Sequence, residues 1–174
     1  YLKHISLKSL LKLSRPRFWL YLLGPYALGV LAAGMPSNQT DWRIWLFALY
    51  FTFPANLLIY GVNDMFDYET DKHNLKKGGY EELLTPEKHK RVLQIIALAN
   101  IPFFIFLPID QQILVPFILF ILFGIFYSAP PIRAKTKPFL DSAFNILYAI
   151  PGVFAYQLAD GTVISGPSNA GPVT

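Results

Sequence analysis

Five long runs without a charged residue dominate the sequence and limit what the chain can fold into. They cover residues 18–40, 44–63, 92–109, 111–132 and 142–159, and each is 18 to 23 residues long. About 20 apolar residues in a helix cross the roughly 30 Å hydrocarbon layer of a bilayer. Backbone groups in lipid must pair within their own segment, so such runs form helices. The pattern therefore predicts an all-α, polytopic transmembrane helical bundle with five spans.

The basic residues are distributed unequally between alternate connections. Five precede the first run, six lie in residues 64–91 and three in residues 133–141, whereas the other connections hold only Arg43. Cytoplasmic loops carry the excess of Lys and Arg. We therefore expect an integral, multi-pass membrane protein whose 64–91 and 133–141 connections face the cytoplasm. Because the net charge of +4 follows this alternation, the expected partner is the lipid bilayer and no nucleic acid.

The chain divides into three parts. Residues 1–17 form a basic amphipathic segment suited to a membrane surface. Residues 18–160 form the transmembrane domain, and residues 161–174 are expected to be a loop or tail. Within the domain, Thr85 followed by Pro86 predicts the start of a helix that runs into the third span. The absence of Cys excludes disulfides and thiol nucleophiles.

An amide and three carboxylates follow the second run directly: Asn63, Asp64, Asp67 and Asp71. If the helix continues, all four lie within an arc of about 100° on one face. Tyr60 and Asn56 fall on the same stripe, one and two turns further into the membrane respectively. The spacing therefore predicts a polar stripe at the membrane–cytoplasm boundary.

Like charges at this spacing repel one another and favour a bound cation. All-oxygen ligands suit Mg²⁺, with Mn²⁺ as the alternative ion. The competing interpretation is a solvated acidic helix end balanced by Lys72, Lys76 and Lys77. Ionisable groups at this depth are functional candidates, so we favour the metal site.

A second group of polar residues begins near the end of the fourth run and extends from Tyr127 to Asp141, on the same predicted face. Arg133 and Lys135 are the donors expected on the oxygens of a diphosphate. Ordinary anchoring of a helix end by basic residues is the alternative for this segment.

Together these segments resemble the UbiA superfamily of intramembrane prenyltransferases. The resemblance rests on Asn63-Asp64-x-x-Asp67-x-x-x-Asp71, on Tyr127-Ser128-x-Pro130-Pro131-x-Arg133-x-Lys135 and on Arg15-Pro16. Carotenoid-type members such as lycopene elongase are the most similar, by Ser14-Arg15-Pro16-Arg17-Phe18-Trp19, Asn74-x-Lys76-Lys77 and Pro138-Phe139-Leu140-Asp141-Ser142. Members that act on quinone precursors share much of this pattern.

The resemblance implies transfer of a prenyl group from an allylic, polyprenyl diphosphate to a lipophilic acceptor, such as a carotenoid or an aromatic quinone precursor. It implies Mg²⁺ held by Asn63, Asp64, Asp67 and Asp71, and catalytic roles for Asp64, Asp67, Arg133, Lys135 and Tyr127. The faces of Tyr60 and Tyr127 would stabilise the allyl cation.

The family has about nine transmembrane helices and a second Asp-rich motif after the sixth. This chain stops after the fifth predicted span, so we expect little activity from it alone. Two other functions stay open at this point: a segment of a divalent-cation transporter and a non-catalytic membrane scaffold. A transporter predicts polar groups deep in several spans, where the sequence offers little beyond Asn100 and Asn145.

Overall fold

A computed structural model describes residues 5–34, 41–73 and 83–164, and every regular element within them is helical. The α-helices are α1 (Leu7–Leu13), α2 (Leu20–Ala32), α3 (Trp42–Phe66), α4 (Tyr68–Asp71), α5 (Pro86–Asn100), α6 (Gln111–Phe126), α7 (Pro138–Phe144) and α8 (Ile150–Ile164). Short 3₁₀ segments are η1 (Pro16–Phe18), η2 (Ile101–Phe106), η3 (Ala134–Thr136) and η4 (Asn145–Tyr148).

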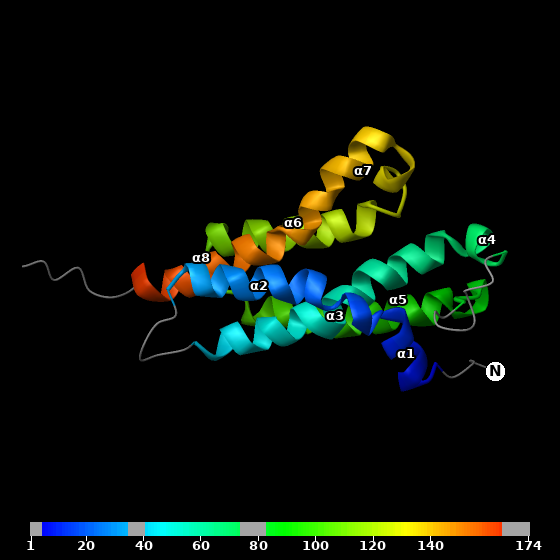
Figure 1. Cartoon of the computed structure of the whole chain (residues 1–174). Coiled ribbons are helices and arrows are strands. Elements are labelled where there is room, and N and C mark those ends of the chain that lie inside the picture. Colours follow the sequence, from blue (N-terminus) through cyan, green and yellow to red (C-terminus); the bar gives the residue numbers. More distant parts are fainter. Residues whose placement is uncertain (1–4, 35–40, 74–82, 165–174) are drawn as a thin grey trace, which may run out of the picture.

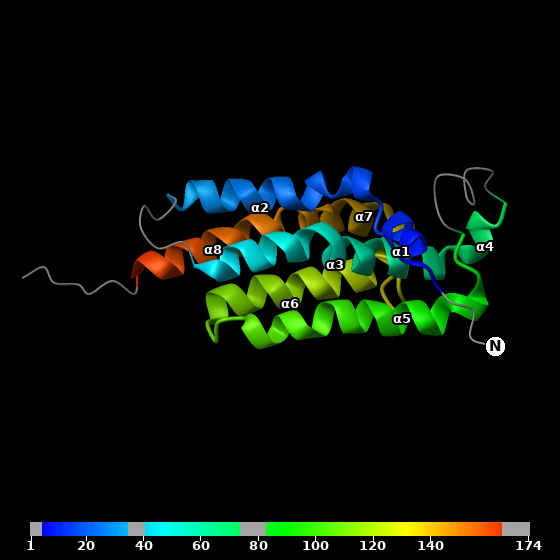
Figure 2. The ribbon, with the colours of Figure 1, turned by 90° about the horizontal axis from the view of Figure 1, so that it is seen from below.

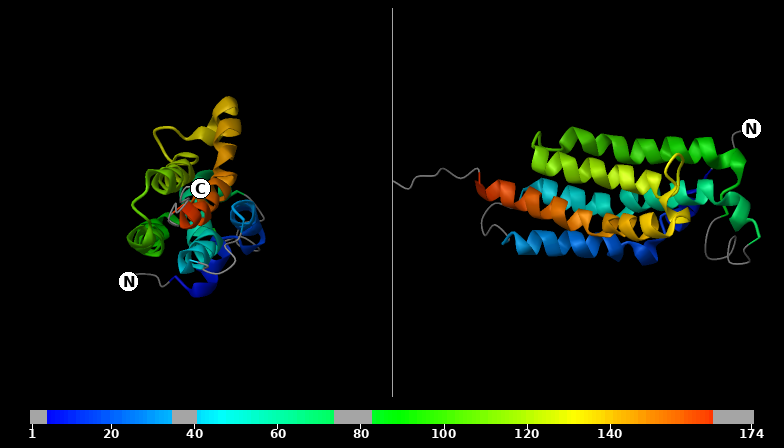
Figure 3. Two further views of the ribbon diagram at one scale, coloured as in Figure 1. Left: turned by 90° about the vertical axis from the view of Figure 1, so that its left-hand side faces the viewer. Right: turned by 90° about the horizontal axis from the view of Figure 1, so that it is seen from above.

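Helix α3 is the central element of the bundle. It packs against α2, α5, α6 and α8, while α2 and α8 also pack against each other. Figure 2 shows these helices, α2, α3, α5, α6 and α8, side by side. The end-on view shows α3 among its neighbours (Figure 3). Helices α1, α4 and α7 gather toward one end, and the α5–α6 connection lies at the other (Figure 1). This alternation agrees with the order of connections predicted from the charges.

The core on the inner side of α3 is aromatic. Fully buried rings from α3, α6 and α8 fill it: Phe47, Tyr50, Phe51, Phe117, Phe120 and Phe154. Phe47 and Phe154 stand edge to face with ring centroids 4.9 Å apart. Such pairs add about 0.5–1.5 kcal/mol beyond their buried area. Most of the chain's aromatic residues that lie in this region are therefore structural.

Helices α2 and α8 approach closely at a pair of glycines. A Cβ atom on Gly29 would lie 2.1 Å from the carbonyl oxygen of Gly152, and one on Gly152 would lie 2.9 Å from the Pro25 carbonyl. Small residues let helix backbones approach closely, and this is a main source of helix association in membranes. The two glycines therefore set the spacing of α2 and α8.

Three helical stretches are long and apolar enough to cross a membrane: Trp42–Phe66, Pro86–Phe106 and Pro138–Ala159. Leu20–Ala32 and Gln111–Phe126 are apolar but shorter. All five predicted apolar helices therefore exist, but the count of five spans is not confirmed. The fourth run gives a short helix because α6 ends at Phe126, ahead of Pro130 and Pro131, which cannot continue it.

Three further expectations concern helix ends. Helix α5 begins at Pro86 as predicted and runs into η2, although the Thr85 side chain makes no capping hydrogen bond. Within the basic N-terminal segment, α1 starts after Ser6, whose hydroxyl accepts from the Ser9 amide at 3.1 Å. Helix α8 continues to Ile164, so residues 161–164 of the expected tail are helical. The remainder, 165–174, lies outside the described residues.

Candidate active site

The acidic motif lies where helix α3 ends. The helix stops at Phe66, and Asp67 follows with φ −101° and ψ 0°, before the single turn of α4. The expectation that one unbroken helix carries the motif through Asp71 is therefore wrong. The last carbonyls of α3 carry partial negative charge, which disfavours carboxylates at this end. Cations must be close by to stabilise them.

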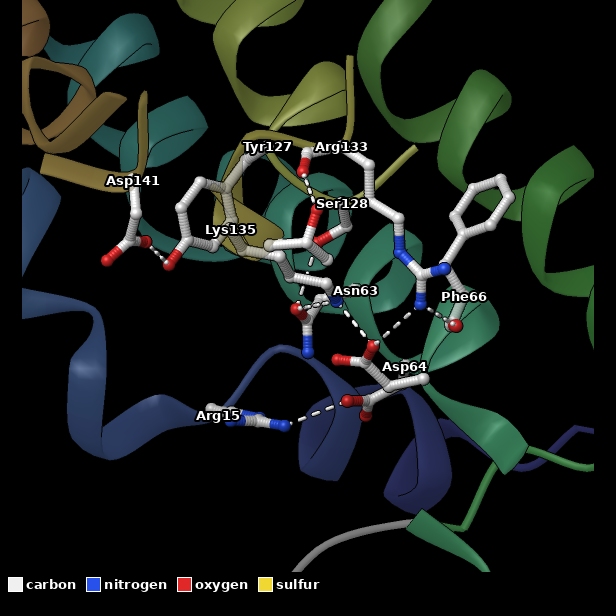
Figure 4. Close-up of polar contacts among 11 residues, drawn as sticks. Arg15, Asn63, Asp64, Phe66, Tyr127, Ser128, Arg133, Lys135 and Asp141 are labelled. Carbon is white, nitrogen blue, oxygen red and sulfur yellow. Dashed lines mark hydrogen bonds and ion pairs between the residues drawn. The ribbon is translucent and has the colours of Figure 1, made fainter. Parts of the chain in front are cut away.

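Lys135 supplies one of these cations. Its ammonium donates to Asn63 Oδ1 at 3.1 Å and to Asp67 Oδ1 (Figure 4). The Ser128 hydroxyl donates to the same Asn63 oxygen at 2.9 Å. These contacts join the two sequence motifs, which are 65 to 72 positions apart. Folding therefore brings together Asn63, Asp67 and Lys135, three residues that the sequence analysis assigned to one site.

Arg133 reaches the same carboxylate from a strained backbone position. One of its guanidinium nitrogens lies 3.9 Å from Asp67 Oδ1 and donates to the Phe66 carbonyl at 3.2 Å. Its φ of +44° is in the left-handed region, which non-glycine residues rarely adopt. Its side chain remains 44% exposed. Arg133 is thus held more loosely than Lys135, whose side chain is 14% exposed.

Asp64 is paired with a residue to which the sequence assigned no role. The Arg15 guanidinium donates to Asp64 Oδ1 at 2.8 Å, and the Asp64 side chain is only 2% exposed. The same guanidinium lies 4.8 Å from the ring centre of Tyr60. Arg15 also has a left-handed backbone, with φ +49°. The sequence feature that could have identified Arg15 as a site residue is its position beside Pro16, just before the first apolar run.

Tyr127 is held on the far side of Lys135. Its hydroxyl donates to Asp141 Oδ1 at 2.8 Å, and its carbonyl accepts from the Lys135 amide at 3.1 Å. Partial burial, followed by the hydrogen bond to the Asp141 carboxylate, raises the pKa of Tyr127 to about 12. Asp141, to which the sequence also assigned no role, therefore orients a predicted site residue.

The two ends of the predicted polar stripe are Asp71 and Asn56. Asp71 lies on α4, beyond the interruption at Asp67. Asn56 is buried inside the bundle, where its amide donates to the carbonyls of Phe51 and Thr52 near Pro54. A proline removes a backbone donor from a helix, and polar side chains commonly stabilise carbonyls at such points. Asn56 therefore has a structural role.

The other polar residue singled out deep in a span is also structural. The Asn100 amide donates to the carbonyls of Ile96 and Pro54, at 2.9 and 3.2 Å, and so links α5 to α3. Asn145 is exposed on the outside of the bundle. Neither observation favours an ion path through the spans.

The donor set agrees with Mg²⁺ in kind. Asn63, Asp64 and Asp67 offer amide and carboxylate oxygens, and Mg²⁺ needs only one or two protein carboxylates when phosphate completes its shell. Among the described residues, no three His, Asp or Glu side chains converge to hold a metal by themselves. Asp64 and Asp67 are instead balanced by Arg15 and Lys135. The repulsion between the acids is thus relieved by the protein's own cations.

An aromatic group adjoins the Arg15 side of the site. Phe18 lies 5.7 Å from Tyr60 and 5.4 Å from Tyr21, and Tyr21 stands edge to face with Tyr148 at 6.2 Å, measured between ring centroids. Tyr60 adjoins the charged residues through the Arg15 guanidinium, which lies over its ring. The electron-rich faces of such rings can stabilise a cation that lies close to them.

Comparison with known proteins identifies relatives over most of the chain. Residues 22–173 match the model of the UbiA prenyltransferase family. The chain is 40% identical over 162 residues to a lycopene elongase/hydratase of Haloarcula japonica, covering 92% of this chain and 54% of the relative. It is 41% identical over 155 residues to the lycopene elongase/hydratase of Haloferax volcanii, covering 86% and 50%.

A further relative is the C(50) beta-cyclic carotenoids biosynthesis protein LbtBC of Dietzia sp., 31% identical over 159 residues, covering 88% of this chain and 36% of the relative. The chain spans about half the length of the first two relatives. No solved structure matches it significantly. The apolar helices, the joined motifs and the match over residues 22–173 lead to one conclusion: the chain belongs to the UbiA prenyltransferase family and is an integral membrane protein.

Proposed function

We propose that this chain takes part in the transfer of a prenyl group from an allylic diphosphate to a lipophilic acceptor within the membrane, in carotenoid biosynthesis. The relatives named for lycopene elongation and for carotenoid biosynthesis support the acceptor class. One structural observation carries the proposal: Lys135 and Arg133 come from one motif and meet Asn63 and Asp67 of the other. Anion donors and metal-ligand oxygens therefore lie side by side.

The chemistry requires this combination. Departure of diphosphate develops negative charge on its oxygens, and preorganised cations lower the barrier by stabilising that charge. Arg133 and Lys135 would bind the outer oxygens, with the guanidinium offering a fork and the ammonium a point charge. Asn63, Asp64 and Asp67 would hold Mg²⁺, which when bound would neutralise further charge on the leaving group. We place this site at the cytoplasmic boundary, following the excess of Lys and Arg at this end of the bundle.

The allyl fragment left behind is cationic and must be protected. The rings of Tyr60 and its neighbours Phe18 and Tyr148 would stabilise it by roughly 0.5–2 kcal/mol each. The surrounding apolar bundle would exclude water, which otherwise adds to the cation. Tyr127, whose raised pKa keeps it neutral, would line the same region from the Lys135 side.

The test is a prenyl-transfer assay in membranes that contain the protein. Radiolabelled allylic diphosphates of several chain lengths are supplied with Mg²⁺ and with lycopene or a quinone precursor, and lipid products are separated. Because the chain spans half of its relatives' length, the assay is run on the chain by itself and on a fusion that adds the unmatched part of the Haloarcula japonica relative.

The expected result is a labelled carotenoid whose formation is abolished by Asp64→Ala together with Asp67→Ala. The matched control is Glu69→Ala, which removes an exposed acid of the same segment that is paired with Lys72 and should leave turnover unchanged. Product formation that survives the double substitution contradicts the proposed site. Absence of product with every donor and acceptor, in both forms, contradicts the proposed activity.

A further inference from the structure

The ammonium of Lys135 contacts the two oxygens that a metal ion at this site would need as ligands. Its two acceptors are Asn63 Oδ1 and Asp67 Oδ1, and these are the amide and carboxylate oxygens that suit Mg²⁺. The Lys135 side chain is only 14% exposed, so it is enclosed with its acceptors. A divalent cation and this ammonium cannot both contact the same two oxygens, because like charges at such short separation repel strongly.

The two carboxylates of the site are held differently. Asp64 is 2% exposed and paired with Arg15, whose side chain is 16% exposed. Asp67 is 23% exposed, and the second cation that reaches it, Arg133, is 44% exposed and 3.9 Å away. Exchange of partners therefore needs little rearrangement at Asp67, whereas at Asp64 it would strand a buried charge. Because Asp67 is more exposed than Asp64, Lys135 and Arg133 are the cations whose carboxylate partner can accept a replacement.

We propose that Lys135 acts as an internal substitute for the divalent cation, so that metal and diphosphate bind only as a coupled pair. This inference rests on the proposed function, in which the same cations meet a diphosphate. The diphosphate draws Lys135 and Arg133 from Asp67 to its own oxygens, and the metal then takes the released amide and carboxylate oxygens. Diphosphate therefore raises the affinity for the metal, and the metal must raise the affinity for diphosphate by the same factor. Metal by itself has to displace Lys135 without compensation and binds weakly.

The test measures binding rather than turnover. Mn²⁺ binding to the purified full chain in detergent is followed by electron paramagnetic resonance, with and without inorganic pyrophosphate, after correction for the Mn²⁺–pyrophosphate complex in solution. For the wild-type chain, pyrophosphate should tighten Mn²⁺ binding by about tenfold or more, within the usual range of such couplings. An equal Mn²⁺ affinity with and without pyrophosphate overturns the proposal, and so does an absence of Mn²⁺ binding when pyrophosphate is present.

The variant Lys135→Met removes the ammonium and keeps the apolar length of the side chain. Mn²⁺ alone should then bind about tenfold more tightly than to the wild type, and the effect of pyrophosphate should fall below about threefold. The control is Lys137→Met, because Lys137 is an exposed lysine two residues further along the same connection. It should leave both values unchanged. Circular dichroism and thermal melts confirm that each variant is folded, and the wild-type measurement decides the question if Lys135→Met is not.

The binding test of Lys135 and the prenyl-transfer assay of the proposed function can fail independently of each other. Coupled binding without prenyl transfer supports the role of Lys135 and contradicts the assigned reaction. Prenyl transfer by a protein in which Mn²⁺ and pyrophosphate bind independently supports the reaction and contradicts the role of Lys135. An unchanged coupling in Lys135→Met contradicts that role directly.

Discussion

The Arg15 guanidinium donates to Asp64 Oδ1 at 2.8 Å, and so ties the segment that precedes α2 to the last turn of α3. The two residues are 49 positions apart, and the carboxylate side chain is 2% exposed. Removing one partner of a buried ion pair leaves an uncompensated charge and costs about 3–5 kcal/mol. Arg15→Met should therefore lower the free energy of unfolding in detergent by about that amount.

A double-mutant cycle tests this interpretation of Arg15. Arg15→Met combined with Asp64→Asn removes both charges, so the loss should be smaller than the sum of the two single losses. Arg17→Met removes an exposed cation two residues away, whose guanidinium lies 4.6 Å from the centre of the Phe18 ring, and should cost about 1 kcal/mol or less. Additive losses in the cycle would show that the pair does not stabilise the fold.

The close approach of α2 and α8 predicts a sharp difference between two glycines of one helix. A methyl group at Gly29 would meet the Gly152 carbonyl oxygen at 2.1 Å, whereas nothing lies within 4 Å of one at Gly24. Gly29→Ala must push two backbones apart and should destabilise the protein by about 1–3 kcal/mol. Gly24→Ala should be neutral or stabilise it by up to about 1 kcal/mol, because alanine favours the helix. Thermal unfolding of both variants provides the comparison, and equal melting temperatures would contradict the packing.

Tyr127 should ionise far above the usual range for tyrosine. Partial burial and the hydrogen bond to Asp141 raise its pKa to about 12 from 10.0, because both disfavour the phenolate. Asp141→Asn removes the charge of the acceptor and should move the pKa of Tyr127 back toward 10. The ¹³C shift of the labelled ring carbon beside the hydroxyl, assigned with Tyr127→Phe, reports the titration. A wild-type midpoint near pH 10 would contradict the contact.

Asp41 is expected to stabilise the start of α3. Its carboxylate accepts from the Arg43 amide at 2.9 Å and from the Arg43 side chain at 2.8 Å. Asp41→Ala should cost about 0.5–2 kcal/mol, whereas Asp41→Asn, which can still cap the helix, should cost less. Chemical unfolding in detergent measures both losses, and equal losses would show that capping is not the cause.

The contribution of Asp41 should depend on pH in one direction. Burial disfavours its charged form, but the hydrogen bonds and charge of Arg43 outweigh burial and lower the pKa of Asp41 below 3.8. The charged form is thus the one stabilised in the folded protein. The stability difference between wild type and Asp41→Asn should be constant above that ordinary value and disappear as the pH falls through the lowered pKa. A difference that grows on acidification would contradict this assignment.

The fold was predictable where one physical requirement dominates. Apolar runs of membrane length are expected to be helical, and each of the five contains helix in the structure, although the fifth is divided between α7, η4 and α8. Their lengths were less predictable, because a run without charges continues past the point where the helix ends. Pro130 and Pro131 extend the fourth uncharged run to residue 132, yet α6 ends at Phe126. Conversely, α5 begins among charged residues at Pro86, six positions before its uncharged run.

The candidate site was likewise predictable only in part. Spacing along one helix placed Asn63 and Asp67 together, and topology placed Lys135 and Arg133 at the same end of the bundle. The pairing of Arg15 with Asp64 and of Tyr127 with Asp141 depends on tertiary approach across separate elements, which periodicity does not encode. Asn56 matched the helical stripe but turned to its own backbone near Pro54, because a buried amide takes the nearest carbonyl.

The left-handed backbone at Arg133 has a consequence for attempts to make this protein more robust. A non-glycine residue in that conformation costs about 1–2 kcal/mol. The ion pair at 3.9 Å and the hydrogen bond to the Phe66 carbonyl, both from a side chain that is 44% exposed, each return about 1 kcal/mol at most. Asparagine tolerates the conformation better, so a screen for heat resistance alone will accept Arg133→Asn at little cost. The same screen would remove a proposed diphosphate donor. Position 133 is therefore where selection for stability and selection for catalysis should diverge.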